Sequence, residues 1–277
     1  MPMLARAPDT ARFHSGPSIQ DNRVKHMGPT SAFVPKDGIE MPCLTMNHGS
    51  GSSTGVTEML LNFSKTLPRA PTGVIVIEAH GFGVAGLGIA VHGDGNLSKA
   101  IMELLPDARS GYVSGHGVRD CVPAFCDVPV VAVSLRGTED PSEHLAMGAA
   151  LAPLRKQGVV IVGSGVPSIH NFEVLFRNPT NANIQKSFLF DAWLTSAVSI
   201  SAQKERFDML KTWDCAPGAR VCHSEGAAEH FFPTLVVAGA AGDHSGAPCF
   251  PESHPSIIGL KKNAELKFPA RHYVFGG

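Results

Sequence analysis

The sequence predicts an α/β fold: a single domain with a central mostly parallel or mixed sheet, flanked by helices on both faces. Three observations support this predicted fold class. Short β-branched runs such as GVIVIE (73–78) are typical of strands buried on both faces. Amphipathic helical patterns separate these runs along the chain, as in layered α/β folds. A length of 277 residues suits one large domain of this kind.

The individual elements follow from periodicity and from helix-start and helix-stop signals. Residues 1–40 lack periodicity and are rich in turn formers, so they are expected to form a loose tail or arm, and residues 41–277 the domain. Predicted strands cover 41–46, 73–78, 128–135, 158–165 and 233–242. Predicted helices cover 57–67, 96–105, 140–156, 186–199 and 202–213.

Composition excludes several classes of partner. The net charge is −1, with 23 basic and 24 acidic residues and no Lys/Arg run, so neither nucleic acid nor a membrane is an expected partner. The six cysteines form no CxxC pair, which favours reduced thiols and a cytoplasmic location. A homo-oligomer is one state that the chain could adopt.

Histidines recur where predicted strands end. His48, His80 and His170 each follow a strand, and His116 lies in a glycine-flanked loop before the 128–135 strand. His230 lies just before the last predicted strand. Ligands of α/β sheets bind outside the carboxyl ends of the strands, so these side chains are expected to share one rim. Taken alone, any one of these histidines is more often structural or solvent-exposed than catalytic. Three of them share the strand-end position, and imidazole suits Fe, Zn, Cu and Ni, so together they indicate a metal site.

Several sequence blocks together resemble the class III extradiol ring-cleavage dioxygenases, most closely the DOPA dioxygenase branch. The blocks are NHGS (47–50), VIVIEAH (74–80), GHG (115–117), VPVVAVSL (128–135), 144–171 and EHFFPTLVVAGAAG (229–242). The resemblance covers most of residues 41–245. Order, spacing and residue types match best over 144–171.

This resemblance implies a role for each histidine. By motif, His48, His80 and His230 would hold a divalent metal, with Glu229 as a substitute for His230. His170 would act as acid/base near the metal, and His116 would contact substrate or oxygen. The implied metal is Fe(II) for catalysis, with Zn(II) as another metal the site could bind, and the implied partners are a small aromatic diol and O₂.

Some positions depart from the family pattern. Gly51 follows the HGS block where Pro is usual, Gly115 replaces the usual Asp before His116, and the loop from His80 to Asn96 is short. Residues 118–120 replace a turn that commonly contains Trp. The resemblance implies an extradiol dioxygenase cleaving a small, DOPA-like catechol. The departures favour one alternative, an inactive metal-binding scaffold of the same fold, and a zinc hydrolase is the other.

Overall fold

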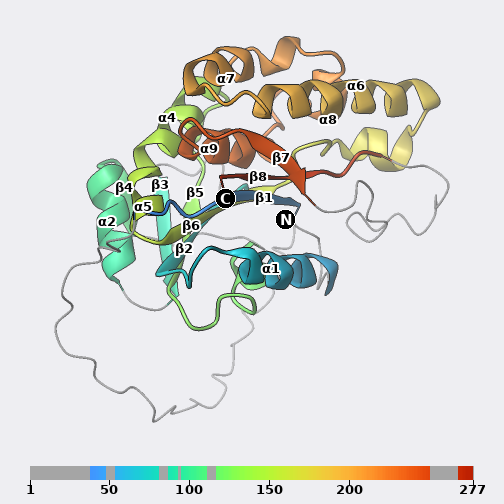
Figure 1. The fold of residues 1–277 in the computed structure, drawn as a ribbon. Helices are drawn as coiled ribbons and strands as arrows, with labels where there is room; N and C mark the ends of the chain where they lie inside the picture. Colours follow the sequence, from blue (N-terminus) through green and yellow to red (C-terminus); the bar gives the residue numbers. More distant parts are fainter. Residues whose placement is uncertain are drawn as a thin grey trace, which may run out of the picture. The chain divides into compact units, whose positions relative to one another are not determined.

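A mixed sheet of eight strands organises the described part of the chain (Figure 1). The structure, a computed structural model, describes residues 38–47, 54–80, 87–92, 95–110, 117–249 and 268–276. The strand order is β4-β3-β5-β2-β6-β1-β8-β7. The strands are β1 (Cys43–Asn47), β2 (Gly73–Glu78), β3 (Leu87–His92), β4 (Ala108–Ser110), β5 (Val130–Ser134), β6 (Val159–Gly165), β7 (Gly246–Cys249) and β8 (His272–Phe275). The predicted fold class is confirmed.

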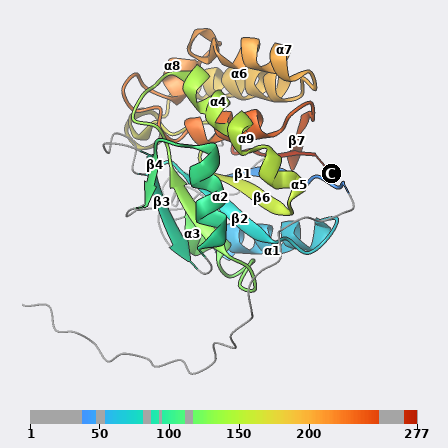
Figure 2. The ribbon, with the colours of Figure 1, turned by 90° about the vertical axis from the view of Figure 1, so that its left-hand side faces the viewer.

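Helices cover both faces of the sheet, α1 on one and α4 and α9 on the other (Figures 1 and 2). They are α1 (Thr54–Thr66), α2 (Asn96–Leu104), α3 (Gly117–Cys121), α4 (Pro141–Leu151), α5 (Pro153–Lys156), α6 (Asn181–Val198), α7 (Gln203–Leu210), α8 (Ala219–Cys222) and α9 (Phe232–Ala240), with a π-helix η1 (Glu173–Arg177) and a 3₁₀ turn η2 (Trp213–Cys215). Successive strand residues alternate between two apolar cores. Val74 and Val76 pack with α1 and α3, whereas Ile75 and Ile77 pack with α2, α4 and α9.

The four central strands, β5-β2-β6-β1, are all parallel and end at one level. Asn47, the last residue of β1, pairs with Gly165, the last residue of β6. Glu78, the last residue of β2, pairs with Ser164 of β6. The chain therefore leaves three neighbouring strands at the same carboxyl edge, which is where α/β sheets bind ligands.

One predicted strand, 233–242, is wrong, because this segment forms helix α9. All nine residues of α9 are buried. A helix buried on every side shows no amphipathic period, so its apolar run resembles that of a buried strand. Strands β3, β4, β7 and β8 were not predicted. All of them lie outside the four central parallel strands. β4, β7 and β8 have only three or four residues, and β3 follows directly on the glycine-rich stretch after His80.

Two glycines let α4 and α9 pack unusually closely. A Cβ on Gly148 would lie 1.9 Å from the carbonyl oxygen of Val236, and one on Gly239 would lie 2.2 Å from that of Leu145. Both obstructions are backbone atoms, which cannot rotate away. This close approach fixes the distance between α4 and α9. Since α9 starts two residues after His230, it also helps to position His230.

We therefore expect Gly148→Ala to lower the free energy of unfolding by about 3 kcal/mol or more, beyond the usual cost of overpacking, because the helices must separate. Gly95→Ala is the matched control, since a Cβ there meets nothing within 4 Å. Urea titration of both variants, followed by far-UV circular dichroism, measures the difference. Equal stability of the two variants would contradict the packing argument.

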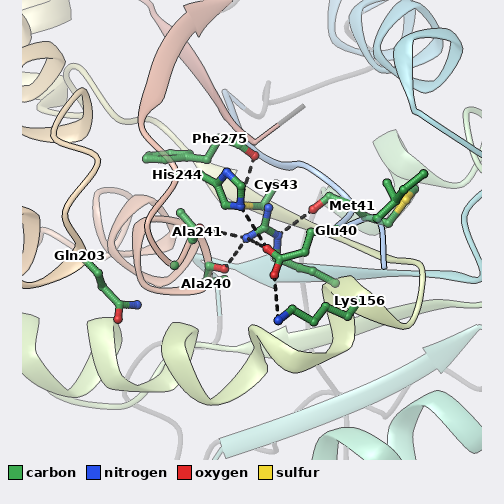
Figure 3. Close-up of polar contacts among 12 residues, drawn as sticks. Glu40, Met41, Cys43, Lys156, Gln203, Ala240, Ala241, His244 and Phe275 are labelled. Atoms are coloured by element: carbon green, nitrogen blue, oxygen red, sulfur yellow. Dashed lines mark hydrogen bonds and ion pairs between the residues drawn. The ribbon is translucent and has the colours of Figure 1, made fainter. Parts of the chain in front are cut away.

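A buried arginine, Arg155, holds the start of the described domain, and Figure 3 labels the residues that contact it, among them Glu40, Met41 and Ala240. Arg155, 1% exposed, donates to the carbonyl oxygens of Met41, Ala240 and Ala241 and lies 3.3 Å from a carboxylate oxygen of Glu40. These contacts join the segment that precedes β1 to the end of α9. The carbonyl acceptors and the carboxylate compensate the guanidinium for its lost hydration.

Other predictions concern the chain as a whole. The chain divides into two units, Met1–Phe33 and Val34–Gly277, and all described residues belong to the second. The expected arm, residues 1–40, lies almost wholly outside the described residues and stays a prediction. All six cysteines are described, and each is a free thiol. Among the described helices, none combines the length and apolar character needed to cross a bilayer.

Candidate metal and catalytic site

The loop that carries His170 is fixed by hydrogen bonds at the carboxyl edge. It leaves β6 at Gly165, and the backbone N–H of His170 donates to the carbonyl of Cys222 (3.0 Å). The imidazole of His223 donates through Nε2 to the carbonyl of Pro167 (3.0 Å). Both partners lie at the end of α8. The backbone beside His170 is therefore held on a rigid element, as a catalytic side chain requires.

His230 is brought to the same edge by a close backbone contact. The N–H of Val166, just beyond β6, donates to the carbonyl of His230 (2.8 Å). A Cβ on Gly165 would lie 2.3 Å from that carbonyl oxygen, so glycine is required for the approach. Because Gly165 has no side chain, the backbone of His230 can lie directly against the end of β6.

Three imidazoles from separate parts of the chain meet here. The rings of His170 and His230 are stacked, with centroids 3.4 Å apart and planes at 15°. His80, two residues after β2, approaches His230 edge-on, with centroids 5.0 Å apart and planes at 84°. His230 is buried, and the other two are half-buried. The strand-end pattern in the sequence accounts for His80 and His170, which follow β2 and β6, whereas His230 precedes helix α9 and not the strand predicted there.

Glu229 completes the polar group. One of its carboxylate oxygens lies 2.8 Å from Nδ1 of His230. Ligand atoms of His170, Glu229 and His230 all lie within 4.8 Å of one another, close enough to share a metal ion. Because the carboxylate engages Nδ1, Nε2 is the His230 atom left to bind a metal, an arrangement common among metal-binding histidines.

Burial and neighbouring charge shift the pKa values of this group. Burial lowers the pKa of His170 to about 3, and the nearby His230 lowers it as well. The hydrogen bond with His230 lowers the pKa of Glu229 to about 2, against the opposing effect of burial. At neutral pH the site therefore contains a neutral His170 and an ionised Glu229.

A buried carboxylate anchors the segment after His116. Glu78, fully buried, accepts a hydrogen bond from the backbone N–H of Val118 (2.9 Å). Gly117 packs against Ser164, whose Oγ would lie 2.4 Å from a Cβ there. Burial raises the pKa of Glu78 to about 7. His116 itself lies outside the described residues, but the residue after it is fixed at the carboxyl edge by β2 and β6.

His48 also lies outside the described residues, and β1 is described up to the residue before it. That residue, Asn47, is fully buried, and its backbone N–H donates to Nδ1 of His272 (3.3 Å). His272 is buried, with 4% of its surface exposed. It lies on β8, directly beside the end of β1, so its packing role supports the strand that leads to His48.

Sequence reasoning missed two contributors near the site. Glu78 has a visible signal, a single acidic residue closing a β-branched run, because such a residue at a buried strand end needs polar partners. Phe172 lies two residues after His170, and its ring centroid is 4.6 Å from that of the imidazole. Its only signal is its position next to the His-Asn pair.

Curated proteins with similar sequences include named dioxygenases. The dioxygenase tasH of Hapsidospora irregularis is 38% identical over 155 residues, 52% of this chain and 46% of that protein. The 4,5-DOPA dioxygenase extradiol of Beta vulgaris is 33% identical over 128 residues, 44% of this chain and 42% of that protein. The 4,5-DOPA dioxygenase extradiol of Escherichia coli K12 is 24% identical over 250 residues, 77% of this chain and 90% of that protein. No family model matches the chain.

The fold also has a solved counterpart. The crystal structure of the uncharacterised protein JW3007 from Escherichia coli K12 superposes with a TM-score of 0.66 at 21% identity, covering 85% of this chain and all of that one. At this identity the likeness concerns the fold alone. The first two curated relatives are matched over less than half of their length. By sequence, the chain is similar to proteins named dioxygenase and 4,5-DOPA dioxygenase extradiol, and the resemblance seen in its motifs is confirmed.

Proposed function

We propose that this chain is a cytoplasmic, non-haem, metal-dependent extradiol dioxygenase that cleaves the ring of a small catechol with O₂. The observation that carries the proposal is the cluster of His80, His170 and His230, three imidazoles from distant segments gathered at the carboxyl edge of a parallel sheet. Relatives named extradiol dioxygenases support the type of chemistry.

In this proposal His48, His80 and His230 hold the metal. Imidazole donors suit Fe(II) and Zn(II) alike, so the described donor set fits either ion. Three protein ligands leave open positions for a diol and for O₂. Bound Fe(II) would supply the redox chemistry of ring cleavage, whereas Zn(II) has none and would support only binding.

The chain's own residues would manage the protons. Burial holds the pKa of His170 low, but an ionised diol oxygen beside the imidazole would raise that pKa. His170 would then accept the remaining diol proton and return it later, as general acid/base catalysis requires. Glu229 would hold the imidazole of His230 in one orientation. His116 would orient the diol or O₂, and Glu78 would fix the segment that follows it.

The direct test starts with protein purified without oxygen. We expect about one metal ion per chain and, after loading with Fe(II), O₂ uptake with a new visible absorbance when catechols are supplied. Zinc-loaded protein is the matched control and should bind the diols without O₂ uptake. Bound metal without uptake on any diol would instead support the inactive scaffold of the same fold.

A further inference from the structure

Two exposed phenylalanines, Phe172 and Phe176, form what we term the aromatic wall. Their side chains are 57% and 47% exposed, and their ring centroids lie 5.6 Å apart. Single exposed apolar residues are common on protein surfaces. Two in mutual contact, one of them against a site histidine, form a continuous apolar surface, and such surfaces tend to serve binding.

The aromatic wall has a fixed backbone. Asn171 donates through Nδ2 to the carbonyl of Val221 (2.9 Å), and its side-chain oxygen accepts from the N–H of Val174 (3.3 Å). Val174 and Leu175, which belong to η1, are buried. Irregular π-helical turns such as η1 occur frequently at functional sites. The two rings are therefore presented by an anchored turn.

The position of the wall relates it to the proposed site. The ring of Phe172 lies 4.6 Å from that of His170, at 60°. The charged residues of the same turn, Glu173 and Arg177, are 62% and 80% exposed and lie 3.4 Å from each other. These two charges thus pair with each other in solvent, and the ring of Phe172 gives His170 an apolar neighbour.

We infer that the aromatic wall receives the ring substituent of the diol, and that the substrate is therefore a catechol whose substituent is apolar and uncharged. The inference rests on the proposed function. Contact between phenyl rings and an apolar substituent removes apolar surface from water, which is favourable. A zwitterionic amino-acid substituent placed against the rings would lose hydration, and the described charged residues of this turn, Glu173 and Arg177, already pair with each other.

Calorimetric titration of zinc-loaded protein tests this without turnover. Catechol, 4-tert-butylcatechol and DOPA serve as probes for wild type, Phe172→Ala, Phe172→Leu and Phe188→Ala. Phe188, 46% exposed on α6, is the matched control, since among the described side chains it makes no aromatic contact with the wall.

We expect wild type to bind 4-tert-butylcatechol about tenfold more tightly than DOPA, because burying about 60 Å² of apolar surface gives roughly that factor. Phe172→Ala should remove most of this preference while changing affinity for catechol less than about threefold. Phe172→Leu should restore part of it, and Phe188→Ala should change nothing.

Three results would overturn the inference. They are tighter binding of DOPA by wild type, an equal loss for all three diols in Phe172→Ala, or the same loss in Phe188→Ala. Failure of wild type to bind any diol would be a different outcome, because it would reject the proposed function itself and this inference with it.

Discussion

Replacing His170 with alanine should lower the rate of O₂ uptake on any accepted catechol by about 10²–10⁴-fold, while bound metal stays within about twofold of wild type. The proposed acid/base histidine handles protons and does not hold the ion. Its backbone is fixed by hydrogen bonds that alanine retains, such as the N–H bond to the carbonyl of Cys222. Metal per chain and oxygen-electrode rates on the same Fe(II)-loaded sample measure both effects.

The control is His244→Ala. This histidine, with 47% of its side chain exposed, lies 3.2 Å from a carboxylate oxygen of Glu40, which also pairs with Arg155. It should change neither metal content nor rate. The informative contrary result is loss of metal in His170→Ala. Ligand atoms of His170, Glu229 and His230 lie within 4.8 Å of one another, so that result would transfer His170 to the ligand set.

The sequence predicted the parts of the site that depend on strand ends. In a parallel sheet every strand delivers its carboxyl end to one edge, so a histidine after a buried run is placed by topology alone. His80 and His170 were placed in this way. His48 and His116 were predicted by the same reasoning and lie outside the described residues, so their roles stay predictions.

Other features depend on tertiary packing, which periodicity does not report. Helix α9 was predicted as a strand because contact through Gly148 and Gly239 buries it on every side and removes any polar face. In the sequence, Glu229 and His230 are adjacent and are interpreted as two alternative metal ligands. Only the 2.8 Å contact shows that one side chain engages the other.

That contact predicts a larger loss of bound metal in His230→Ala than in Glu229→Ala. His230→Ala should reduce bound metal to below about a tenth of wild type at a free Zn(II) concentration that saturates wild type, because it removes a ligand. Glu229→Ala should weaken binding only about 10–100-fold, the usual cost of losing a partner that orients a ligand, and excess metal should restore occupancy. Titration against chelator-buffered Zn(II) separates the two cases.

Glu229→Gln decides between orientation and direct ligation. A glutamine oxygen can still accept a hydrogen bond from Nδ1–H of His230, so an orienting role predicts that this variant binds metal better than Glu229→Ala. If Glu229 is itself a metal ligand, Glu229→Gln replaces an ionised donor with a neutral amide. Both Glu229 variants would then lose metal as severely as His230→Ala. Since Glu229 and His230 are adjacent in the chain and 2.8 Å apart at their polar atoms, only this graded comparison can assign the ion to one of them.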